Sequence, residues 1–442
     1  MPPRRLDGSP VAPDSPLARR LAARGPQAPV ELVHDGAVVT ARAGEPLALS
    51  LAADGRTALS RSPKYHRPRG PMCLRGHCEG CLLRVDGEPN VMACRTAVHP
   101  GLVATSQNAF PSARVDVFRV TDWFFPKHLD HHHLMVGLGA TLNRTMQSIA
   151  RKMAGLGTLP DTAEPCLPAA VTHVDALVVG AGSSGVAAAN ALARAGLRVL
   201  CCDGEAAPGG LRRDDPNDDL ADLEPLDPRV EFVASSMAVA TYDHGTLLAE
   251  GDALRLVHAR ARVFACGTVD TVGTFVHNDL PGIYTARGFA RALCHGVLLA
   301  DRVALVGPTP GAPALGALLA TLGLRRLHTL PAATVAEALG SSALQGAALQ
   351  VGAETLTVRP LDALVVGGEP ASAYELAGQA GADTRWDARR RCFVPATEPD
   401  GSTGAPGVFV TGSLRLGVVA PAARRADGRA VAQTVIAHLL TP

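Results

Sequence analysis

The spacing of apolar and polar residues predicts a small β-rich domain in the first part of the chain. Two short alternating stretches within residues 30–55 flank an Asp35-Gly36 pair, which is typical of a hairpin turn, and a helical pattern follows them. Residues 82–92 repeat the alternating pattern around Asp86-Gly87. We therefore expect two hairpins and one short helix in a compact domain that spans residues 30–115.

A different pattern begins further along the chain, where apolar runs alternate with helical segments. Residues 174–205 contain an apolar strand, a glycine-rich turn, an Ala-rich helix and a second strand, which is the order of a βαβ unit. A second strand–glycine–helix pattern covers residues 302–323. These features predict a doubly wound α/β domain over residues 173–285 and 362–442, interrupted by a smaller inserted domain at 286–361.

Two stretches carry neither pattern. Residues 1–29 are rich in Pro and Arg and poor in apolar side chains, so we expect a disordered or extended tail there. Residues 116–172 connect the two domains and include a helical pattern near 138–153 before a Pro-rich end. The run Asp130–His133 has side chains that can bind metal, but we interpret it as a polar surface segment.

Composition and charge argue against two classes of partner. The formal net charge is +1 and the basic residues are scattered, so no global field favours nucleic acid. No apolar run reaches the roughly 18–20 residues that a membrane span needs, so we expect none. Ten cysteines in 442 residues are too few for a disulfide scaffold, and four of them fall within 22 positions. This distribution indicates a metal site in a reducing compartment, and we expect a cytoplasmic protein.

The clustered cysteines follow the spacing C-x4-C-x2-C-x12-C, at Cys73, Cys78, Cys81 and Cys94. Four thiolates are what a [2Fe–2S] cluster requires, two for each iron. Gly76 and Gly80 let the loop fold around the inorganic core, and the last cysteine follows the second hairpin. A structural zinc site would favour two C-x2-C pairs instead. We therefore predict an iron–sulfur cluster with these four ligands.

The first strand–turn–helix of the α/β domain contains the glycine motif Gly180-Ala-Gly182-Ser-Ser184-Gly185. In this context the glycines allow a tight turn and the close approach of a pyrophosphate to the amino end of the helix. Asp203, at the end of the second strand, can accept hydrogen bonds from a ribose hydroxyl. A second glycine turn at Gly209-Gly210 favours FAD over NAD as the dinucleotide.

The inserted domain contains a weaker version of this motif. The turn Gly307-Pro-Thr-Pro-Gly311 lacks the middle glycine, and its prolines remove backbone donors that would hold a phosphate. We therefore expect a degenerate nucleotide site that is vestigial or has another use.

A series of short segments also matches one protein family in order. The segments are SRSPKYHRPRG (60–70), SQNAFPS (106–112), FACGT (264–268), HNDLPGIY (277–284), GGEP (367–370), GVFVTGS (407–413) and DGR (427–429). With them the chain resembles the α subunit of heterotetrameric sarcosine oxidase and the related subunits of hydrogen cyanide synthase, opine oxidases and dye-linked proline dehydrogenases. Sarcosine oxidase itself lacks the cluster cysteines, so their presence here points to the cluster-containing form.

The resemblance implies a β-grasp, ferredoxin-like domain followed by a doubly wound FAD-binding Rossmann domain with an inserted, degenerate nucleotide-binding domain. It adds Gly267, Gly412 and Ser413 to the flavin site, with Ser413 standing where the family usually has Asp. It also implies a separate flavin-dependent, amine-oxidising β subunit, small additional subunits, FMN at a subunit interface, and ATP or NAD in the inserted domain.

These observations favour the electron-transfer subunit of a heteromeric flavin-dependent amine or amino-acid dehydrogenase or oxidase, of the sarcosine, opine or proline type. Such a subunit relays electrons between flavin and the [2Fe–2S] cluster. Two alternatives stay open: a self-sufficient NAD(P)H-dependent FAD/[2Fe–2S] reductase, and a non-catalytic scaffold subunit that retains the cluster. No catalytic arrangement is legible in the sequence, so the amine substrate and the residues that oxidise it are unassigned.

Overall fold

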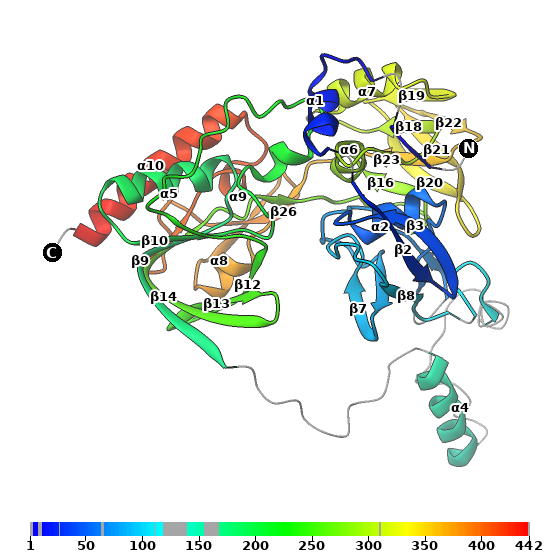
Figure 1. Ribbon diagram of the computed structural model, residues 1–442, viewed down its shortest axis with the longest axis horizontal. Coiled ribbons are helices and arrows are strands. Elements are labelled where there is room, and N and C mark those ends of the chain that lie inside the picture. The colour runs from blue at the N-terminus through cyan, green and yellow to red at the C-terminus, as the bar shows by residue number, and fades with distance from the viewer. Residues whose placement is uncertain are drawn as a thin grey trace. The chain divides into compact units, whose positions relative to one another are not determined.

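The computed structural model describes residues 3–7, 11–25, 27–62, 66–109, 111–117, 139–153, 168–308 and 311–440. The chain divides into two compact units, each made of two separate stretches of sequence (Figure 1). The first unit comprises Met1–Ala163 and Val272–Gly368, and the second comprises Glu164–Thr271 and Glu369–Pro442.

A five-stranded sheet with one helix forms the ferredoxin-like part of the first unit. Its strands lie in the order β3 (Ala37–Arg42), β2 (Pro29–His34), β8 (Val103–Ser106), β6 (Leu82–Val85) and β7 (Glu88–Met92). Strands β2 and β8 pair in parallel, the two hairpins pair antiparallel, and α2 (Leu47–Ala53) is almost entirely buried. This is the predicted β-grasp arrangement.

The two hairpin turns follow directly from their sequences. Asp35 and Asp86 both adopt a φ of 49°, and the glycines that follow them, Gly36 and Gly87, have φ of 77° and 94°. A positive φ at both central residues is what a type I′ hairpin turn requires, and Asp-Gly supplies it at low cost. Both predicted hairpins are therefore confirmed.

The expectation of a disordered or extended amino-terminal tail is wrong for the residues that the structure describes. Strand β1 (Arg4–Arg5) pairs antiparallel with β17 (Val297–Leu298). Helix α1 (Pro16–Ala23) begins at Ser15, whose hydroxyl accepts a hydrogen bond of 3.1 Å from the backbone N–H of Ala18. A serine cap followed by proline is a recognised helix start, and this signal was present in the sequence.

Two leucines and one ion pair compensate for the low apolar content of this segment. Leu6 and Leu17 are 4% and 0% exposed and belong to the core of the first unit. Arg5 donates two hydrogen bonds, of 2.7 and 2.9 Å, to the carboxylate of buried Glu45. Burying two leucine side chains contributes roughly 3–6 kcal/mol to the docking of this segment on the first unit.

The inserted part of the first unit contains a four-stranded parallel sheet and a three-stranded antiparallel sheet. The parallel strands lie in the order β16 (Ile283–Thr285), β23 (Ala363–Val366), β18 (Arg302–Val306) and β19 (Arg326–Leu330), with helices α6 (Ala286–Cys294) and α7 (Ala312–Thr321). The antiparallel strands are β20 (Thr334–Gly340), β21 (Leu344–Val351) and β22 (Glu354–Val358). The sequence placed β16 and β23 in the surrounding α/β domain, whereas backbone pairing assigns both to the insert.

The second unit is built on a seven-stranded mixed sheet. Its order is β11 (Glu231–Val233), β10 (Val199–Cys202), β9 (Ala169–Val179), β14 (Ala253–Phe264), β13 (Gly245–Glu250) and β12 (Ser236–Tyr242), and β27 (Val408–Val410) also pairs with β14. Helices α5 (Ser183–Arg194) and α10 (Pro421–Leu440) lie side by side and share one apolar core with the sheet (Figure 1). The predicted βαβ unit is confirmed.

The connecting segment is described only between residues 139 and 153, where α4 (Ala140–Met153) matches the predicted helix. The Asp130–His133 run lies outside the described residues. Within the described ranges, no helix is both long and apolar enough to cross a membrane.

Candidate cofactor sites

The cysteine loop and the second hairpin of the ferredoxin-like domain bring the four predicted thiols together. Cys73, Cys81 and Cys94 are each 1% exposed, whereas Cys78 is partly exposed. The backbone N–H of Ala93 donates a hydrogen bond of 3.1 Å to the carbonyl of Cys81, which fixes the end of the hairpin against the loop. The site is thus closed to solvent on three of its four ligands.

Two glycines shape this loop as the sequence predicted. Gly76 has a φ of 85°, which favours glycine. A Cβ atom on Gly80 would overlap the carbonyl oxygen of Gly70. The loop therefore lies directly on the backbone of residue 70, an approach that a larger side chain would prevent.

The four thiols are arranged as two pairs. A hydrogen bond with Cys73 lowers the pKa of the Cys78 thiol to about 5, and the same bond together with burial raises the pKa of Cys73. In the same way, the pKa of Cys94 is lowered by its bond with Cys81, while the pKa of Cys81 is raised by that bond and by burial. Each pair therefore contains one thiol whose pKa is lowered, and the thiolate is the form that binds metal.

This pairing suits a two-iron cluster, in which each iron takes two of the four thiolates. In the part of the chain that the structure describes, no three His, Cys, Asp or Glu side chains converge as the ligands of one metal ion would. A [2Fe–2S] cluster needs only two thiolates at each iron. The backbone N–H groups of Arg75 and His77 also approach the Cys73 Sγ, at 3.4 and 3.2 Å, as donors to a cluster ligand would.

The glycine turn between β9 and α5 has the shape that a pyrophosphate requires. Gly180 has a φ of 103°, and a Cβ there would lie 2.6 Å from the carbonyl oxygen of Ala265. A Cβ on Gly185 would overlap the carbonyl oxygen of Gly180, so strand and helix pack backbone to backbone. No atom lies within 4 Å of the Cβ position of Gly182, which leaves open space at the start of the helix.

A buried hydroxyl and a carboxylate border this open space. Ser183 is 6% exposed, and its Oγ has no hydrogen-bond partner among the residues described. The Asp203 carboxylate accepts hydrogen bonds from the N–H groups of Ala181 and Glu205, at 2.6 and 2.8 Å. A carboxylate has about four acceptor positions, so Asp203 can support the turn and still accept a ribose hydroxyl. An unpaired hydroxyl at a helix amino terminus suits a bound phosphate.

The second glycine turn folds back onto the first. The N–H of Gly209 donates a hydrogen bond of 2.8 Å to the carbonyl of Ala181. A Cβ on Gly210 would lie 3.0 Å from the Cα of Gly182, and both glycines of the second turn have positive φ. Both predicted glycine turns therefore border one space.

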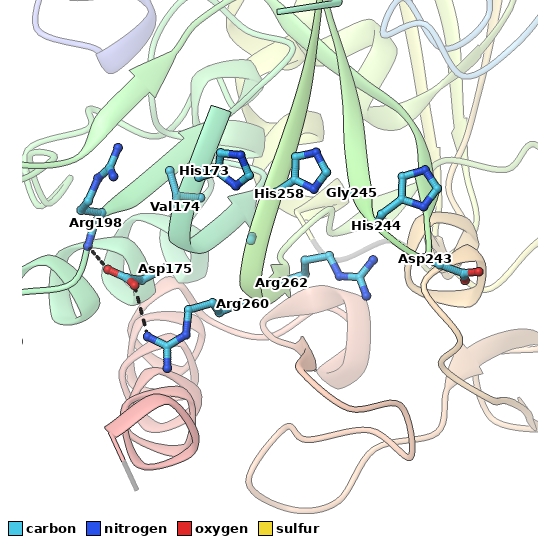
Figure 2. Close-up of a pocket in the computed structure, with 11 residues that line it drawn as sticks. His173, Val174, Asp175, Arg198, Asp243, His244, Gly245, His258, Arg260 and Arg262 are labelled. Carbon is cyan, nitrogen blue, oxygen red and sulfur yellow. Dashed lines mark hydrogen bonds and ion pairs between the residues drawn. The ribbon is translucent and has the colours of Figure 1, made fainter. Parts of the chain in front are cut away.

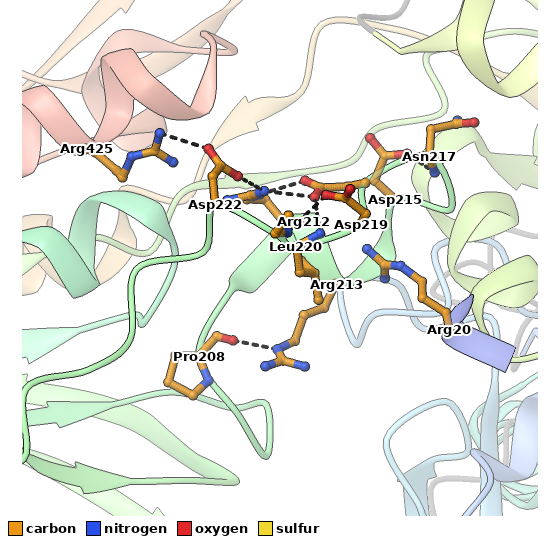
Figure 3. Close-up of polar contacts among 12 residues, drawn as sticks. Arg20, Pro208, Arg212, Arg213, Asp215, Asn217, Asp219, Leu220, Asp222 and Arg425 are labelled. Carbon is orange, nitrogen blue, oxygen red and sulfur yellow. Dashed lines mark hydrogen bonds and ion pairs between the residues drawn. The ribbon is translucent and has the colours of Figure 1, made fainter. Parts of the chain in front are cut away.

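An ionic network that sequence analysis missed holds the segment after this turn (Figure 3). Arg212 is 6% exposed and donates hydrogen bonds of 2.6 and 2.8 Å to Asp218. It also donates to Asp222, which accepts a further bond of 3.0 Å from Arg425 on α10. The run of aspartates after Arg212 was the available signal, but its partner on α10 is about 200 residues away.

The carboxy-terminal segment packs against the start of α5, next to the glycine turn. Gly412 has a φ of 70°, and a Cβ there would overlap the Oγ of Ser184. A Cβ on Gly428 would overlap the carbonyl oxygen of Ser184. Ser413 is buried, and the N–H of Gly412 donates a hydrogen bond of 2.7 Å to the buried carboxylate of Asp427. Asp427 is the first residue of the DGR segment, which the sequence matched to the family without assigning it a role, and here it positions the backbone of Gly412.

Two other predicted features have weaker contacts. Gly267 follows β14 with a φ of 74°, and its carbonyl accepts a bond of 3.2 Å from the N–H of Ala373. In the insert, Gly307 has a φ of 95° and a Cβ there would overlap the carbonyl oxygen of Gly367. Thr309 and Pro310 of that turn lie outside the described residues.

The structure also contains a polar cavity that the sequence did not predict (Figure 2). Its volume is about 400 Å³, and it is lined by residues of β9 and β14 and of the turn between β12 and β13. His173 and His258 stack there on neighbouring strands with ring centroids 4.8 Å apart, and Asp175 forms an ion pair of 3.3 Å with Arg260. None of the predicted cofactor residues lines this cavity.

Two stretches of the chain match known domain families. Residues 27–109 match the 2Fe–2S iron–sulfur cluster binding domain, and residues 178–232 match the NAD(P)-binding Rossmann-like domain. The sarcosine oxidase subunit alpha of Rhizobium meliloti is 27% identical over 477 aligned positions, which cover 94% of this chain and 46% of that protein. The hydrogen cyanide synthase subunit HcnA of Pseudomonas aeruginosa is 39% identical over 77 residues, or 17% of this chain and 73% of that protein.

Among solved structures, L-proline dehydrogenase from P. horikoshii has a similar fold. Its TM-score is 0.69 at 18% identity, over 92% of this chain and 73% of that one. The chain spans less than half the length of the sarcosine oxidase subunits that it matches.

Proposed function

We propose that this chain is an electron-transfer subunit. The chain belongs to the family of sarcosine oxidase α subunits and of the related hydrogen cyanide synthase and proline dehydrogenase subunits, and it represents the cluster-containing form of that family. It serves a heteromeric flavin-dependent amine or amino-acid dehydrogenase or oxidase. The observation that carries the proposal is the arrangement of four thiols in two pairs, in the same chain as a glycine turn built for a pyrophosphate.

In this proposal the four cysteines hold a [2Fe–2S] cluster. Cys73 and Cys78 bind one iron, and Cys81 and Cys94 bind the other, because these are the pairs whose thiols already contact each other. The backbone donors of the loop stabilise negative charge on the Cys73 sulfur, and burial excludes water from three ligands. Both effects tune the reduction potential of such a cluster.

The glycine turn of the second unit holds FAD. Gly182 would leave space for the pyrophosphate, the Ser183 hydroxyl would donate a hydrogen bond to it, and Asp203 would accept a hydrogen bond from a ribose hydroxyl. When bound, FAD exchanges electrons singly or in pairs and the cluster exchanges them singly, so the two groups together form a relay. Ser413 stands where the family usually has Asp, and Asp427 positions the backbone of the neighbouring Gly412.

We assign the oxidation of the substrate to a separate flavin-dependent β subunit. The family suggests an amine or amino acid such as sarcosine, an opine or proline as the electron donor, with FMN at the subunit interface and small additional subunits. The inserted domain is the candidate location for ATP or NAD.

The test is purification of the native complex, followed by cofactor analysis and electron paramagnetic resonance of the dithionite-reduced protein. We expect two irons and one FAD for each copy of this chain, and the rhombic signal of a reduced [2Fe–2S] centre. Cys81→Ser should abolish the signal, whereas Cys392→Ser should retain it, because Cys392 lies outside the cluster loop in the second unit.

Three results would contradict the proposal in different ways. Zinc in place of iron, with no signal after reduction, would overturn the cluster assignment. Rapid reduction of the flavin by NADH in the isolated chain would favour a self-sufficient reductase. A cluster without any flavin released on denaturation would favour a scaffold subunit.

A further inference from the structure

The segment HNDLPGIY and the start of helix α6 lie against the cysteine loop, although the family motif has no role in the function proposed above. Both belong to the first unit, in which the insert and the ferredoxin-like domain share one apolar core. The segment and the first turn of α6 contact the residues that lead into Cys73 at three successive points. An insert that served only as a nucleotide site would not need such contacts.

The first two points lie before the helix. Arg69 forms an ion pair of 2.7 Å with Asp279. At the next residue, a Cβ on Gly70 would lie 3.1 Å from the Cβ of Pro281. The carbonyl of Gly70 packs against Gly80 of the cysteine loop. Gly70 is therefore enclosed between the cysteine loop and the insert.

The third point is the amino end of α6 itself. The N–H of Thr285, the cap residue, donates a hydrogen bond of 3.1 Å to the carbonyl of Met72. A Cβ on Gly288 would lie 2.6 Å from the carbonyl oxygen of Cys73 and 2.7 Å from that of Met72. The hydroxyl of Thr285 in turn accepts a 3.0 Å bond from the N–H of Gly288. The first turn of α6 thus packs directly on the backbone of a cluster ligand.

Nothing in the helix itself requires glycine at position 288. Its φ is not in the left-handed region, and glycine costs roughly 1 kcal/mol relative to alanine inside a helix. The close approach to Cys73 is the feature that a side chain would prevent. The positive end of the helix macrodipole lies at this same turn, next to a group that gains negative charge on reduction.

We propose that the insert positions the iron–sulfur cluster. Thr285 and Gly288 are the positioning residues, and they hold Cys73 against the amino end of α6. This positioning role rests on the proposed function, because it presumes that the four cysteines bind a cluster. It assigns to the insert a role in cluster retention and reduction potential that does not depend on whether a nucleotide binds there.

The test compares Gly288→Ala with Gly316→Ala in the purified complex. Gly316 lies in α7 of the same insert, and a Cβ there meets its neighbours at 3.4–3.6 Å, an ordinary contact distance. A redox titration followed by electron paramagnetic resonance measures the cluster directly, without enzyme turnover. At a fixed potential we expect Gly288→Ala to lower the ratio of reduced to oxidised cluster about threefold, which is about 30 mV for a one-electron couple. Gly316→Ala should match the wild type.

A second pair of variants decides the matter if Gly288→Ala does not fold. Thr285→Ser keeps the capping hydroxyl and should keep the wild-type potential and iron content, whereas Thr285→Val removes the hydroxyl and should change both. Suppose that the wild type holds its cluster and that both Gly288→Ala and Thr285→Val keep the wild-type reduction potential and spectrum. The positioning role of the insert is then refuted. If the wild type holds no cluster, the proposed function itself fails, which is a separate result.

Discussion

The buried carboxylate of Asp427 connects three elements of the dinucleotide site and provides a sharp test of its architecture. It accepts hydrogen bonds from the Thr411 hydroxyl at 2.8 Å, from the Gly412 N–H at 2.7 Å and from Arg415 at 2.6 and 3.1 Å. The side chains of Asp427 and Arg415 are 7% and 13% exposed. In Asp427→Ala, the guanidinium of Arg415 stays largely buried without its carboxylate partner, and two further donors lose their acceptor.

The expected magnitude follows from these contacts. Removing one partner of a buried ion pair costs about 3–5 kcal/mol. For a unit of roughly 150–250 residues, each kcal/mol lowers the melting temperature by about 2–4 °C, so the fall should be about 6–20 °C. Because the backbone of Gly412 contacts Ser184 at the start of α5, we also expect FAD affinity to fall by at least about tenfold, or 1.4 kcal/mol.

The assay is thermal unfolding of the purified chain together with FAD titration by flavin fluorescence. Asp427→Asn keeps one acceptor oxygen and should lose less stability than Asp427→Ala. Asp252→Ala, at an exposed turn between β13 and β14, serves as the control and should change neither quantity. If Asp427→Ala melts within 1 °C of the wild type and binds FAD equally well, the network does not position the site.

Three further changes test other parts of the molecule. Leu17→Ala should destabilise the first unit by about 2.7–5 kcal/mol in denaturant titrations, because the side chain is fully buried; no change would mean that α1 is not docked. Hydrogen bonds from Arg302 outweigh burial and lower the pKa of Asp362 below 3.8, so its contribution to stability is present above about pH 4 and is lost at lower pH. Asp362→Asn should therefore reduce the fall in the free energy of unfolding below pH 4. The same fall in the variant as in the wild type would contradict this pH dependence. Gly185→Ala should abolish FAD retention, measured by flavin released on denaturation, since its Cβ would overlap the Gly180 carbonyl; full retention would refute the close packing of strand and helix.

Local patterns predicted those features whose cause is local. The Asp-Gly hairpins were legible because a two-residue turn depends on the φ angles of its own residues. The glycine turn at 180–185 was legible because strand, turn and helix follow one another in sequence. The tail was misjudged for the opposite reason: Leu6 and Leu17 are too few to predict burial, and their core is supplied by residues far along the chain.

From the sequence alone we could predict which side chains would carry the proposed chemistry: four cysteines at a spacing that suits a [2Fe–2S] cluster, and a glycine turn that suits a pyrophosphate. Only the tertiary structure decided how these residues are held. The pairing of the thiols, the approach of Gly412 to Ser184, the contact of Gly288 with Cys73 and the carboxylate of Asp427 beneath Gly412 all join distant segments. The physical reason is that each contact depends on the small distance between two backbones, which is set by packing across the whole unit and leaves no periodic signal along the chain.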